Sequence, residues 1–486
     1  MLPIVLLGFV AALVSATTHI VESPCELLKR LLPSEIILRN ETRYTEVANK
    51  NWATNARRAP SCIVVANNTR SLQEAVKNLT RNSIQFAIRS GGHMIKPGGS
   101  NIDNGVLIDL SRLNEIEYNA IGQVARVGGG ARWGDVYKAL EPHNVTVVGG
   151  RLDDIGVGGL ILGGGLSWLS SRHGLACDNV VNFEVILANG TLINANATSS
   201  TDLYKALKGG GNNFGVVTHF TISTYAIGAV WGGIRYYAPE QFPALISAFS
   251  QYQLGPQDPD ASIMIQAPLT NSSFGVLLNI AYSRPFADPP AFDVFKSIPI
   301  ALDTTSIRSY SSLISGASNP DITQLPRWDW RTATLAANAT LYTEVYNITT
   351  KAPELQSLSQ LQSGTFVFNM QPIPVQTVKA AKALGGNSLG LSEEPQVWVQ
   401  YLMAWWHEED DHKAYSLSKA IMDRVNQAAN KANDSLDYVF MNDASQDQNV
   451  ISSYGRDNVI SMKKVQEKYD STKAFQELVR GGFKLP

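Results

Sequence analysis

The chain has 486 residues, of which 44% are hydrophobic and 17% are charged, and its 40 lysines and arginines nearly balance 42 aspartates and glutamates. This length provides for two or three domains with sizeable cores, and the composition excludes disordered, collagen-like and coiled-coil proteins. The formal net charge of -2, without any Lys/Arg run, argues against nucleic acid or an anionic lipid surface as a partner. Cys25, Cys62 and Cys177 are too few and too dispersed for a zinc ribbon or a CxxC redox centre, and they permit one disulfide at most.

The N-terminus predicts a secreted protein. An uncharged apolar run over residues 1–14 leads into Val14-Ser15-Ala16, the small-residue pattern that signal peptidase accepts, so residues 1–16 are predicted to be a signal peptide. The alternative for this run is a short buried helix, and no later stretch predicts a transmembrane span. In an oxidising compartment Cys25 and Cys62 would form a disulfide and leave Cys177 as a buried thiol.

Asn-X-Ser/Thr sequons recur along the chain, and together with the leader they predict a glycoprotein. Their asparagines are Asn40, Asn67, Asn78, Asn144, Asn189, Asn196, Asn271, Asn338, Asn347 and Asn433.

The segment from about Cys62 to Tyr225 alternates short β-type runs with glycine pairs. A helix is predicted to begin at a Ser71 cap, since a glutamate follows three residues later, and a second helix is predicted around Trp133 from the spacing of its apolar residues. The pair Asn189-Gly190 predicts a hairpin with a type I′ turn. The predicted strands are 84–88, 106–110, 123–127, 145–148, 180–188 and 214–223.

After Tyr225 the composition changes, and proline-rich joints separate longer alternating strands. We expect a second domain built on an antiparallel sheet, with strands at 274–282, 365–371 and 396–406 and a helix at 415–429. The last stretch is predicted to form a strand at 438–442, a loop and a capping helix.

Three glycine-rich loops, at 88–93, 149–165 and 209–218, predict a site for a large dinucleotide. Glycines let backbone N–H groups approach a ligand closely, and successive free N–H groups form a nest that holds a pyrophosphate without a lysine. The first loop ends in Ser90-Gly91-Gly92-His93. A lone histidine is more often a hydrogen-bonded turn residue, but the three loops in order favour a role in ligand binding.

The second loop does not match other glycine-rich motifs. It lacks a clear following helix and a later ribose-binding acid, so it is not a Rossmann fingerprint, and it is not a P-loop. Gly165-Leu-Ser167-Trp-Leu169 lacks the second glycine of a nucleophile elbow, which argues against a serine hydrolase.

The order of these segments resembles the PCMH-type flavin-binding fold of the vanillyl-alcohol-oxidase superfamily. Within that superfamily it is most similar to the berberine-bridge-enzyme-like FAD-linked oxidases, particularly the secreted fungal members. The resemblance spans nearly the whole mature chain and rests on segments 89–93, 127–137, 156–159, 163–165, 173–180 and 211–218, and on Tyr454-Gly455 and 469–483 of the tail.

The resemblance implies an α+β fold with a division into domains. Residues 25–228 would form a PCMH-type FAD-binding domain of two α/β subdomains. Residues 229–436 would form a substrate-binding domain with an antiparallel sheet covered by helices, and residues 437–486 a C-terminal berberine-bridge-like segment that returns to the FAD domain. The oligomeric state is left open.

The resemblance also implies FAD, bonded through its 8α-methyl to His93. A covalent tether prevents loss of the cofactor outside the cell and raises the flavin potential. Bicovalent relatives have a cysteine where this chain has Leu152, so a single linkage is expected, and Ile155 is expected beside the flavin ring, where its bulk influences oxygen access. The residues expected to bind FAD are Ser90, Gly91, Gly92, His93, Met94, Gly150, Arg151, Asp154, Ile155, Gly156, Gly158, Gly159, Gly163, Gly164, His173, Gly174, Asp178, Asn179, Asn213, Phe214, Gly215, Val216, Val217 and Asn442.

The implied reaction transfers a hydride from a C–H next to oxygen or nitrogen to the flavin, while a side chain takes the proton and dioxygen reoxidises the flavin to give peroxide. The substrate is expected against 396–406 and 438–442. Many relatives have Asn-Tyr near the C-terminus, whereas this chain has Asn442-Asp443-Ala444, so the role of that tyrosine does not transfer. Tyr401, Tyr438 and Asp443 are the candidate bases, each with a purely structural role as the alternative.

The predicted function is therefore an oxygen-dependent FAD oxidase acting on a small molecule, in a tailoring step of secondary metabolism such as alcohol or amine oxidation or oxidative ring closure. One alternative is a carbohydrate oxidase acting at an anomeric carbon. Two others are a flavin-fold protein that guides a non-redox cyclisation and a non-catalytic binding glycoprotein.

The run from His407 to His412 contains four acids, but no ligand-spacing motif supports a metal site, so it is interpreted as a solvated turn and helix start. Trp405 and Trp406 alternate along a predicted strand, so only one of them is expected to face the flavin.

Overall fold

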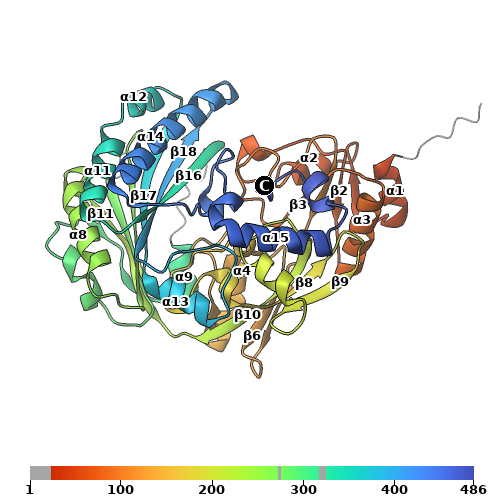
Figure 1. Cartoon of the computed structure of the whole chain (residues 1–486), viewed down its shortest axis with the longest axis horizontal. Coiled ribbons are helices and arrows are strands. Elements are labelled where there is room, and N and C mark those ends of the chain that lie inside the picture. Colours follow the sequence, from red (N-terminus) through yellow and green to blue (C-terminus); the bar gives the residue numbers. More distant parts are fainter. Residues whose placement is uncertain (1–22, 272–274, 317–324) are drawn as a thin grey trace, which may run out of the picture.

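The structure is a computed structural model that describes residues 23–271, 275–316 and 325–486. The signal peptide predicted at 1–16 lies outside these residues. Three β-sheets carry helices on their faces, and Figure 1 shows the largest sheet on one side of the molecule and the two smaller ones on the other. This architecture confirms the α+β fold expected from the sequence.

The first sheet has four strands in the order β1-β2-β4-β3. Strands β2, β4 and β3 are parallel, and β1 pairs antiparallel with β2. All residues of β2 and β4 are buried, as is usual for apolar strands in a parallel sheet with both faces covered. The elements are β1 Ile36–Leu38, β2 Cys62–Val65, β3 Phe86–Arg89, β4 Val106–Asp109, α1 Pro24–Leu31, α2 Tyr44–Ala48 and α3 Thr69–Arg81.

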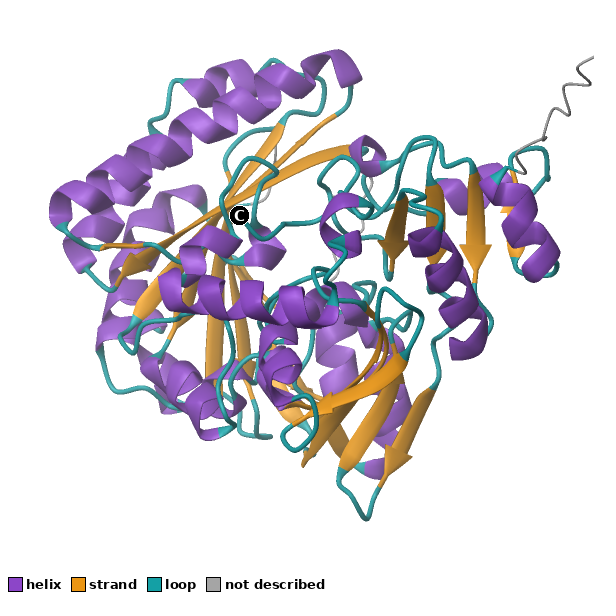
Figure 2. Ribbon diagram, turned by 45° about the vertical axis from the view of Figure 1, so that its right-hand side comes forward, coloured by secondary structure: helices purple, strands orange, loops and turns teal. Residues whose placement is uncertain are grey.

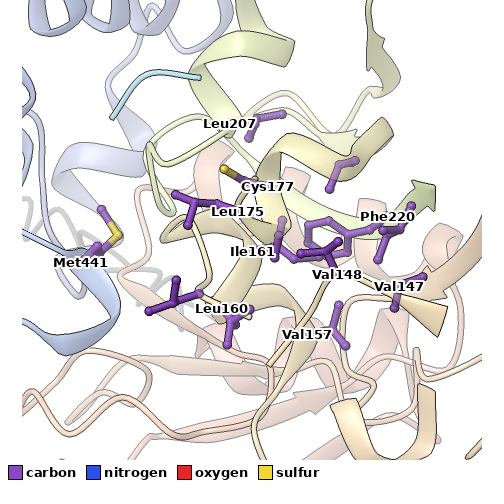
Figure 3. Packing of buried hydrophobic residues seen from close by; sticks show 14 of the residues in the cluster. Val147, Val148, Val157, Leu160, Ile161, Leu175, Cys177, Leu207, Phe220 and Met441 are labelled. Carbon is purple, nitrogen blue, oxygen red and sulfur yellow. The ribbon is translucent and has the colours of Figure 1, made fainter. Parts of the chain in front are cut away.

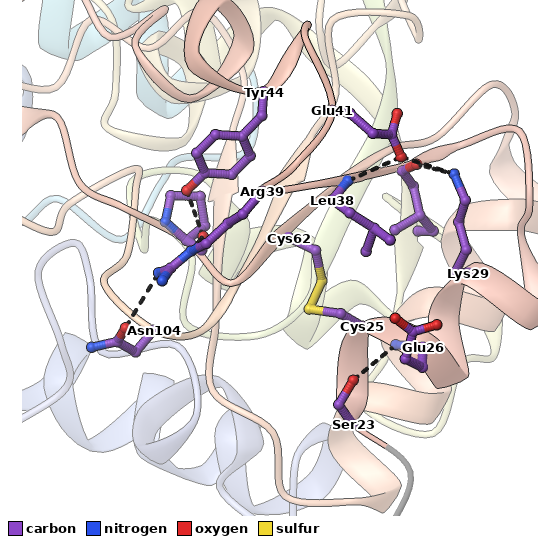
Figure 4. Close-up of a disulfide and its surroundings, with 12 residues drawn as sticks. Ser23, Cys25, Glu26, Lys29, Leu38, Arg39, Glu41, Tyr44, Cys62 and Asn104 are labelled. Atoms are coloured by element: carbon purple, nitrogen blue, oxygen red, sulfur yellow. Dashed lines mark hydrogen bonds and ion pairs between the residues drawn. A yellow bond between two sulfur atoms is a disulfide. The ribbon is translucent and has the colours of Figure 1, made fainter.

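The predicted disulfide between Cys25 and Cys62 is confirmed and joins α1 to β2 (Figure 4). Nearby, the Ser23 hydroxyl caps α1 by accepting a first-turn N–H, and Lys29 lies 3.0 Å from Glu41. The bridge spans a sequence separation of 37 residues, so it restricts the unfolded chain.

The second sheet is antiparallel, in the order β5-β6-β10-β8-β9, with β7 also paired to β10. Strand β10 is the longest and contacts three others, so it holds this sheet together. The elements are β5 Ile116–Asn119, β6 Val124–Gly128, β7 Val145–Val147, β8 Val180–Ile186, β9 Leu192–Asn196, β10 Val216–Ala226, α4 Trp133–Leu140, α5 Val157–Leu162, α6 Ser170–His173 and α7 Thr201–Leu207.

The third sheet has nine strands in the order β14-β11-β13-β12-β17-β18-β16-β19, with β15 paired to β11. Helices α8, α11, α12 and α14 cover its outer face, and the other face turns toward the smaller sheets (Figures 1 and 2). Its strands are β11 Val230–Tyr237, β12 Ala261–Pro268, β13 Val276–Tyr282, β14 Leu302–Asp303, β15 Ser306–Arg308, β16 Arg327–Ala336, β17 Thr365–Ile373, β18 Gln396–Trp405 and β19 Ser435–Leu436. The covering helices are α8 Phe242–Leu254, α11 Ala339–Thr350, α12 Glu354–Ser359 and α14 Asp411–Ala432.

Other helices connect the two halves. Helices α9 and α13 come from the region of the third sheet but pack on α4 and α6. The C-terminal helix α15 packs on α7. The bounds are α9 Tyr310–Ser315, α13 Val375–Ala383, α15 Arg456–Tyr469 and α16 Ala474–Glu477.

A buried apolar cluster joins the second sheet to the C-terminal segment (Figure 3). Helix α5 contributes Val157 and Ile161, which have no exposed surface, and Met441 of the C-terminal segment belongs to the same cluster. Cys177 is buried there as a free thiol, as predicted, and burial raises its pKa well above the usual range. The core therefore fixes α5 against a segment far away in sequence.

The end of the chain is tied to the glycine-rich loops. Asn213 Nδ2 donates to the Phe483 carbonyl at 2.8 Å, and Asn212 Nδ2 donates to the Gly481 carbonyl at 3.1 Å. Lys96 Nζ donates to the Gly482 carbonyl at 2.9 Å. These bonds hold residues 481–483 between the third loop and the segment that follows the first loop.

Several local predictions were wrong. Helix α3 begins at Thr69, and Asn68 rather than Ser71 is its cap, since the Asn68 side chain accepts a hydrogen bond from the Ser71 N–H. The hairpin β8–β9 is confirmed, but of Asn189 and Gly190 only the glycine has a positive φ, so the turn is not type I′.

The predicted strand at 438–442 is also wrong, because residues 441–443 form a 3₁₀ turn and pair with no strand. The second glycine-rich loop does lead into a helix, α5, whose first turn contains Gly158 and Gly159. In the part of the chain that the structure describes, no helix has the length and apolarity needed to cross a bilayer.

Two glycine loops meet backbone to backbone, which generates a stability prediction. A Cβ added at Gly91 would lie 2.5 Å from the Gly156 Cα and N atoms, whereas a Cβ at Gly228 would meet nothing within 4 Å. Gly91→Ala is therefore expected to destabilise the protein by about 1–3 kcal/mol through overpacking. Thermal unfolding should show a lower midpoint for Gly91→Ala than for Gly228→Ala, and equal midpoints would contradict this contact.

Candidate functional site

A cavity of about 830 Å³ lies between the third sheet and the two smaller sheets. Its walls come from the three glycine-rich loops, the inner face of the third sheet and the C-terminal segment, with residues 440–444 and 482–483. The close contact of Gly91 with Gly156 brings the two loops to one side of this cavity.

The first loop presents a row of free backbone donors. Within the described residues, the N–H groups of Gly91, Gly92, His93 and Met94 have no hydrogen-bond partner, and all four residues line the cavity. Gly92 has a φ of +71°, a left-handed conformation that favours glycine. Successive free N–H groups in such a turn form an anion-binding nest. The loop can therefore hold a pyrophosphate with backbone atoms alone.

The loop starts from a rigid base. The Arg89 guanidinium is buried at the end of β3, where Nη2 lies 2.6 Å from Asp109 of β4 and Nη1 donates to the Asn51 side chain at 3.0 Å. On the other side, the Ser90 hydroxyl donates to the Gly129 carbonyl and accepts from the Gly158 N–H. These contacts fix both ends of the segment that leads to His93.

His93 is held among aromatic rings and one carboxylate. Its ring stacks on Trp52, with centroids 4.5 Å apart and an angle of 16° between the planes, and Trp330 lies 5.8 Å away. His93 Nε2 lies 3.4 Å from Asp154 Oδ2. Arg132 ties the two loops together by donating to the backbone carbonyls of Asp154 and Gly91.

The carboxylate of Asp154 is anionic at neutral pH. Partial burial would raise its pKa, but the hydrogen bond and charge of His93 together with the charge of Arg132 lower the pKa overall. His93 therefore has a negative charge beside one of its ring nitrogens.

Asn442 connects the C-terminal segment to the second loop. Its Oδ1 accepts from the Gly165 N–H at 3.1 Å, and its Nδ2 donates to the Gly159 carbonyl at 3.3 Å. A Cβ at Gly163 would lie 2.4 Å from the Asn442 amide, so this contact needs a glycine. Asn442 thus closes the cavity over the end of helix α5.

The opposite wall carries neutral carboxamides on neighbouring strands. Gln266, Asn369 and Gln400 are paired in register across β12, β17 and β18. Asn369 Nδ2 donates to Gln400 Oε1 and Asn279 Nδ2 donates to Gln266 Oε1, each at 2.8 Å. Within the described residues, Asn369 Oδ1 is buried without a hydrogen-bond partner. This wall can exchange hydrogen bonds with uncharged polar groups.

Arg151 and Asp443 are two of the charged residues that line the cavity. Arg151 donates to Gln371 Oε1, and Gln371 Nε2 donates to Asp443 Oδ2 at 3.0 Å. Burial raises the pKa of Asp443 to about 6, against the opposing effects of the Arg151 charge and the Gln371 hydrogen bond. Burial likewise lowers the pKa of Arg151. Asp443 can therefore accept and release a proton near neutral pH.

Many residues predicted to bind a cofactor do line the cavity. These are Ser90, Gly91, Gly92, His93, Met94, Arg151, Asp154, Ile155, Gly156, Gly158, Gly159, Gly215, Val216, Val217 and Asn442.

Other predicted cofactor residues lie behind the lining and support it. His173 stacks on Tyr225 with ring centroids 3.8 Å apart, and burial lowers the His173 pKa to about 4. Asn179 donates to the carbonyls of His173 and Leu175, and Asp178 accepts from the Leu175 N–H. The set that does not line the cavity is Gly150, Gly163, Gly164, His173, Gly174, Asp178, Asn179, Asn213 and Phe214.

Two of the candidate bases are in the wrong place for catalysis. Successive residues of a strand point to opposite faces, and Gln400 and Leu402 line the cavity, so Tyr401 faces the helices, where its hydroxyl lies 2.6 Å from Thr349 Oγ1. Tyr438 is buried between Trp398 and Tyr454 and does not line the cavity. Of the three candidates only Asp443 borders the cavity.

The tryptophan prediction fails for the same reason as Tyr401. Trp405 lies in the helix-covered core and donates to Asp411 at 2.8 Å, while Trp406 follows the end of β18 and is 46% exposed. Neither lines the cavity. The acidic run after them forms a turn and the start of α14, as predicted, and no group of three or more potential metal ligands occurs among the described residues.

Sequence reasoning missed the aromatic residues Trp52, Trp328 and Trp330, and the carboxamides of the sheet. Period-two alternation in 396–406 identifies two faces but gives no reason to choose the even-numbered one. Trp52 precedes the first predicted strand and lies in no recognised motif. Lys96 was also missed, and burial lowers its pKa.

Comparison with known proteins agrees with this geometry. An FAD binding domain family matches residues 60–196. The chain is 38% identical over 413 residues to the FAD-dependent monooxygenase tpcD of Cochliobolus heterostrophus, covering 82% of this chain and 80% of that protein. It is 35% identical over 402 residues to the bifunctional solanapyrone synthase of Alternaria solani, covering 82% and 77%.

Solved structures share the fold at low sequence identity. Glucooligosaccharide oxidase from Acremonium strictum, described with a 6-S-cysteinyl, 8α-N1-histidyl FAD, has a TM-score of 0.79 at 16% identity over 96% of this chain and 100% of that one. The BBE-like 1 protein of Physcomitrella patens has a TM-score of 0.75 at 19% identity, covering 92% and 97%. The chain therefore belongs to the same family of FAD-dependent oxidoreductases as these fungal relatives, and it has the PCMH-type FAD-binding fold of the solved oxidases.

Proposed function

We propose that this enzyme is a secreted oxidase that carries FAD covalently on His93, removes a hydride from a C–H next to oxygen or nitrogen of a small uncharged molecule, and returns the electrons to dioxygen as hydrogen peroxide. We further propose a tailoring step of secondary metabolism, including oxidative ring closure. The observation that carries the proposal is the cavity itself, which has free backbone donors and His93 on one wall and carboxamides with Asp443 on the other.

The cavity fits FAD. The free N–H groups at 91–94 would hold the pyrophosphate, and a Cβ at Gly159 would meet nothing within 4 Å, which leaves room beside helix α5. Ile155 and Asn442 would border the ring system, where Ile155 would influence oxygen access. Bound FAD would supply a hydride acceptor that dioxygen can reoxidise. The remaining steps belong to the side chains of this chain.

Asp443 is proposed as the base. With a pKa of about 6 it is mostly ionised at neutral pH, yet it is close enough to neutrality to take a proton from a hydroxyl or amine as the hydride leaves. Gln371 orients the carboxylate through its Nε2, and Arg151, on the other end of Gln371, balances its charge. Tyr401 and Tyr438 have no part in this proposal.

The third-sheet residues that line the cavity favour an uncharged substrate. Among the described residues that it contributes to the cavity, none is charged, and carboxamides alternate with Tyr236, Trp328 and Trp330. Asn369 Oδ1 would accept a hydrogen bond from a substrate hydroxyl, since a buried acceptor without a partner costs free energy. A molecule with hydroxyl groups and a partly planar skeleton would bond to the carboxamides and pack on the aromatic rings.

Two candidates for the substrate follow. A polyfunctional secondary metabolite is favoured by the relatives, which include a protein named as a synthase and others named as monooxygenases. An oligosaccharide is the second candidate, because the wall is both polar and aromatic.

A monooxygenase would insert an oxygen atom from dioxygen into its product, whereas an oxidase would release both atoms as peroxide.

Secretion is supported by three features of the chain. The Cys25–Cys62 disulfide needs an oxidising compartment. All the predicted sequon asparagines, from Asn40 to Asn433, are exposed or partly exposed, so each is open to glycosylation. The apolar leader at 1–16 is the third feature.

The reaction class is tested by the fate of dioxygen. The purified protein is offered a panel of alcohols, amines, oligosaccharides and polyketide-type phenols while oxygen consumption and peroxide are both recorded. We expect one peroxide for each dioxygen consumed and no ¹⁸O from ¹⁸O₂ in the product. Labelled product would instead identify a monooxygenase.

Two further results of the panel would overturn the proposal. Product formed without oxygen consumption would identify a non-redox cyclase. Binding without turnover of any member, by protein that lacks flavin, would identify a binding glycoprotein.

The base is tested with Asp443→Asn, using the exposed residue change Asp437→Asn as the control. Loss of a general base lowers kcat by roughly 100- to 10,000-fold. Because the base must be deprotonated, kcat/KM of the wild type should fall as the pH drops below about 6 and stay level above it. Asp437→Asn should keep this profile. Wild-type turnover in Asp443→Asn would rule out Asp443 as the base.

A further inference from the structure

Among the described residues, Asp154 is the acid that pairs with His93, and binding of FAD alone gives no reason for this pair. Its Oδ2 lies 3.4 Å from His93 Nε2, and 45% of the Asp154 side chain is exposed against 12% of the histidine. Within the described residues, the other ring nitrogen, Nδ1, has no hydrogen-bond partner. The two nitrogens therefore have different environments.

We propose that Asp154 is the positioning residue for covalent flavin attachment: it keeps the proton of His93 on Nε2 and leaves Nδ1 as the nucleophile. The inference rests on the proposed function, namely that FAD is bonded to His93. A neutral imidazole has one donor and one acceptor nitrogen, and the partner of one nitrogen decides which is which. A carboxylate accepts hydrogen bonds only, so it requires the proton at the nitrogen it faces.

The surroundings fix the ring in this orientation. Trp52 covers one face of the imidazole with nearly parallel planes, and Trp330 lies at an angle beside it. Arg132 donates to the backbone carbonyls of both Asp154 and Gly91, so the acid and the histidine loop cannot separate without breaking at least one of these hydrogen bonds. Arg132 and His93 are the charged or titratable groups that lower the pKa of Asp154.

The bond-forming step also benefits from the negative charge. A bond forms between Nδ1 and the 8α carbon of the flavin, and one C–H bond of that methyl group breaks. The methyl hydrogen and the imidazole hydrogen leave as protons, and the flavin ring system takes up two electrons and two protons. Dioxygen then takes these two electrons and two protons from the flavin and leaves as hydrogen peroxide. As Nδ1 gives up its lone pair, the imidazole gains positive charge, which Asp154 stabilises at Nε2.

The experiment follows attachment rather than turnover. Full-length apoprotein from riboflavin-limited cells is incubated with FAD, samples are denatured in acid at intervals, and protein-bound flavin is read by fluorescence in a denaturing gel. Asp154→Asn keeps a hydrogen-bonding side chain without the charge, and Asp154→Ala removes both. Asp437→Asn is the matched control on an exposed aspartate.

We expect attachment at least about tenfold slower in Asp154→Asn, slower again in Asp154→Ala, and unchanged in Asp437→Asn, by analogy with the carboxylates that orient metal-binding histidines. The melting temperature, measured on the same samples, should stay near wild type because Asp154 is half-exposed, and attachment rates are compared at saturating FAD. Flavin isolated from wild-type protein should be linked through Nδ1.

Attachment at the wild-type rate in both Asp154 variants, or a wild-type linkage through Nε2, would overturn the inference and leave the proposed function intact. A different result would contradict the proposed function itself. If wild-type protein gains no covalent flavin, or His93→Ala gains as much as wild type, the linkage through His93 is wrong and the role of Asp154 falls with it.

Discussion

The site depends on one contact, the backbone-to-backbone approach of Gly91 and Gly156. A side chain on either glycine would overlap the backbone of the other loop, with a Cβ at Gly156 only 2.3 Å from the Gly91 nitrogen. Because the two loops touch there, His93 from the first sheet and Asp154 from the second face each other. The same contact places residues 91–94, whose N–H groups have no partner among the described residues, at the wall of the cavity. The packing of two loops thus brings the reactive groups of the site together.

The two walls of the cavity differ in the polar groups that they offer to a ligand. The loop wall offers backbone donors for an anionic cofactor and needs few cations, which agrees with a chain whose net charge is -2. The sheet wall offers carboxamides to an uncharged substrate. Between them, Gln371 separates Arg151 from Asp443, so Asp443 keeps a pKa of about 6 instead of the low value that a direct ion pair would impose. An acid in such an environment can exchange protons at physiological pH.

The sequence alone predicted those parts of the structure that follow from local patterns. Glycine spacing and the Ser-Gly-Gly-His turn indicated the ligand loops, and apolar runs gave most strands of the smaller sheets to within a few residues. The disulfide followed from cysteine arithmetic. Apart from the disulfide, whose cysteines are separated by 37 residues, these features depend on near neighbours in sequence.

The remainder depends on contacts between distant segments. Period-two alternation could not say which face of β18 borders the cavity, so Tyr401 was chosen although Gln400 and Leu402 line it. The turn at 441–443 follows from its packing against helix α5, and local propensity predicted a strand there. Asp154 was expected to contact FAD, but only the structure brings its carboxylate to His93.

The central claim is that His93 carries the flavin. Its most direct test is the mass of the tryptic peptide 90–112, which contains His93 and in which the Lys96-Pro97 bond resists trypsin. The account predicts that this peptide from the native protein is heavier by one FAD less two hydrogen atoms, with fragmentation placing the addition on His93. An unmodified peptide from flavin-loaded protein, or flavin on a different residue, would contradict it.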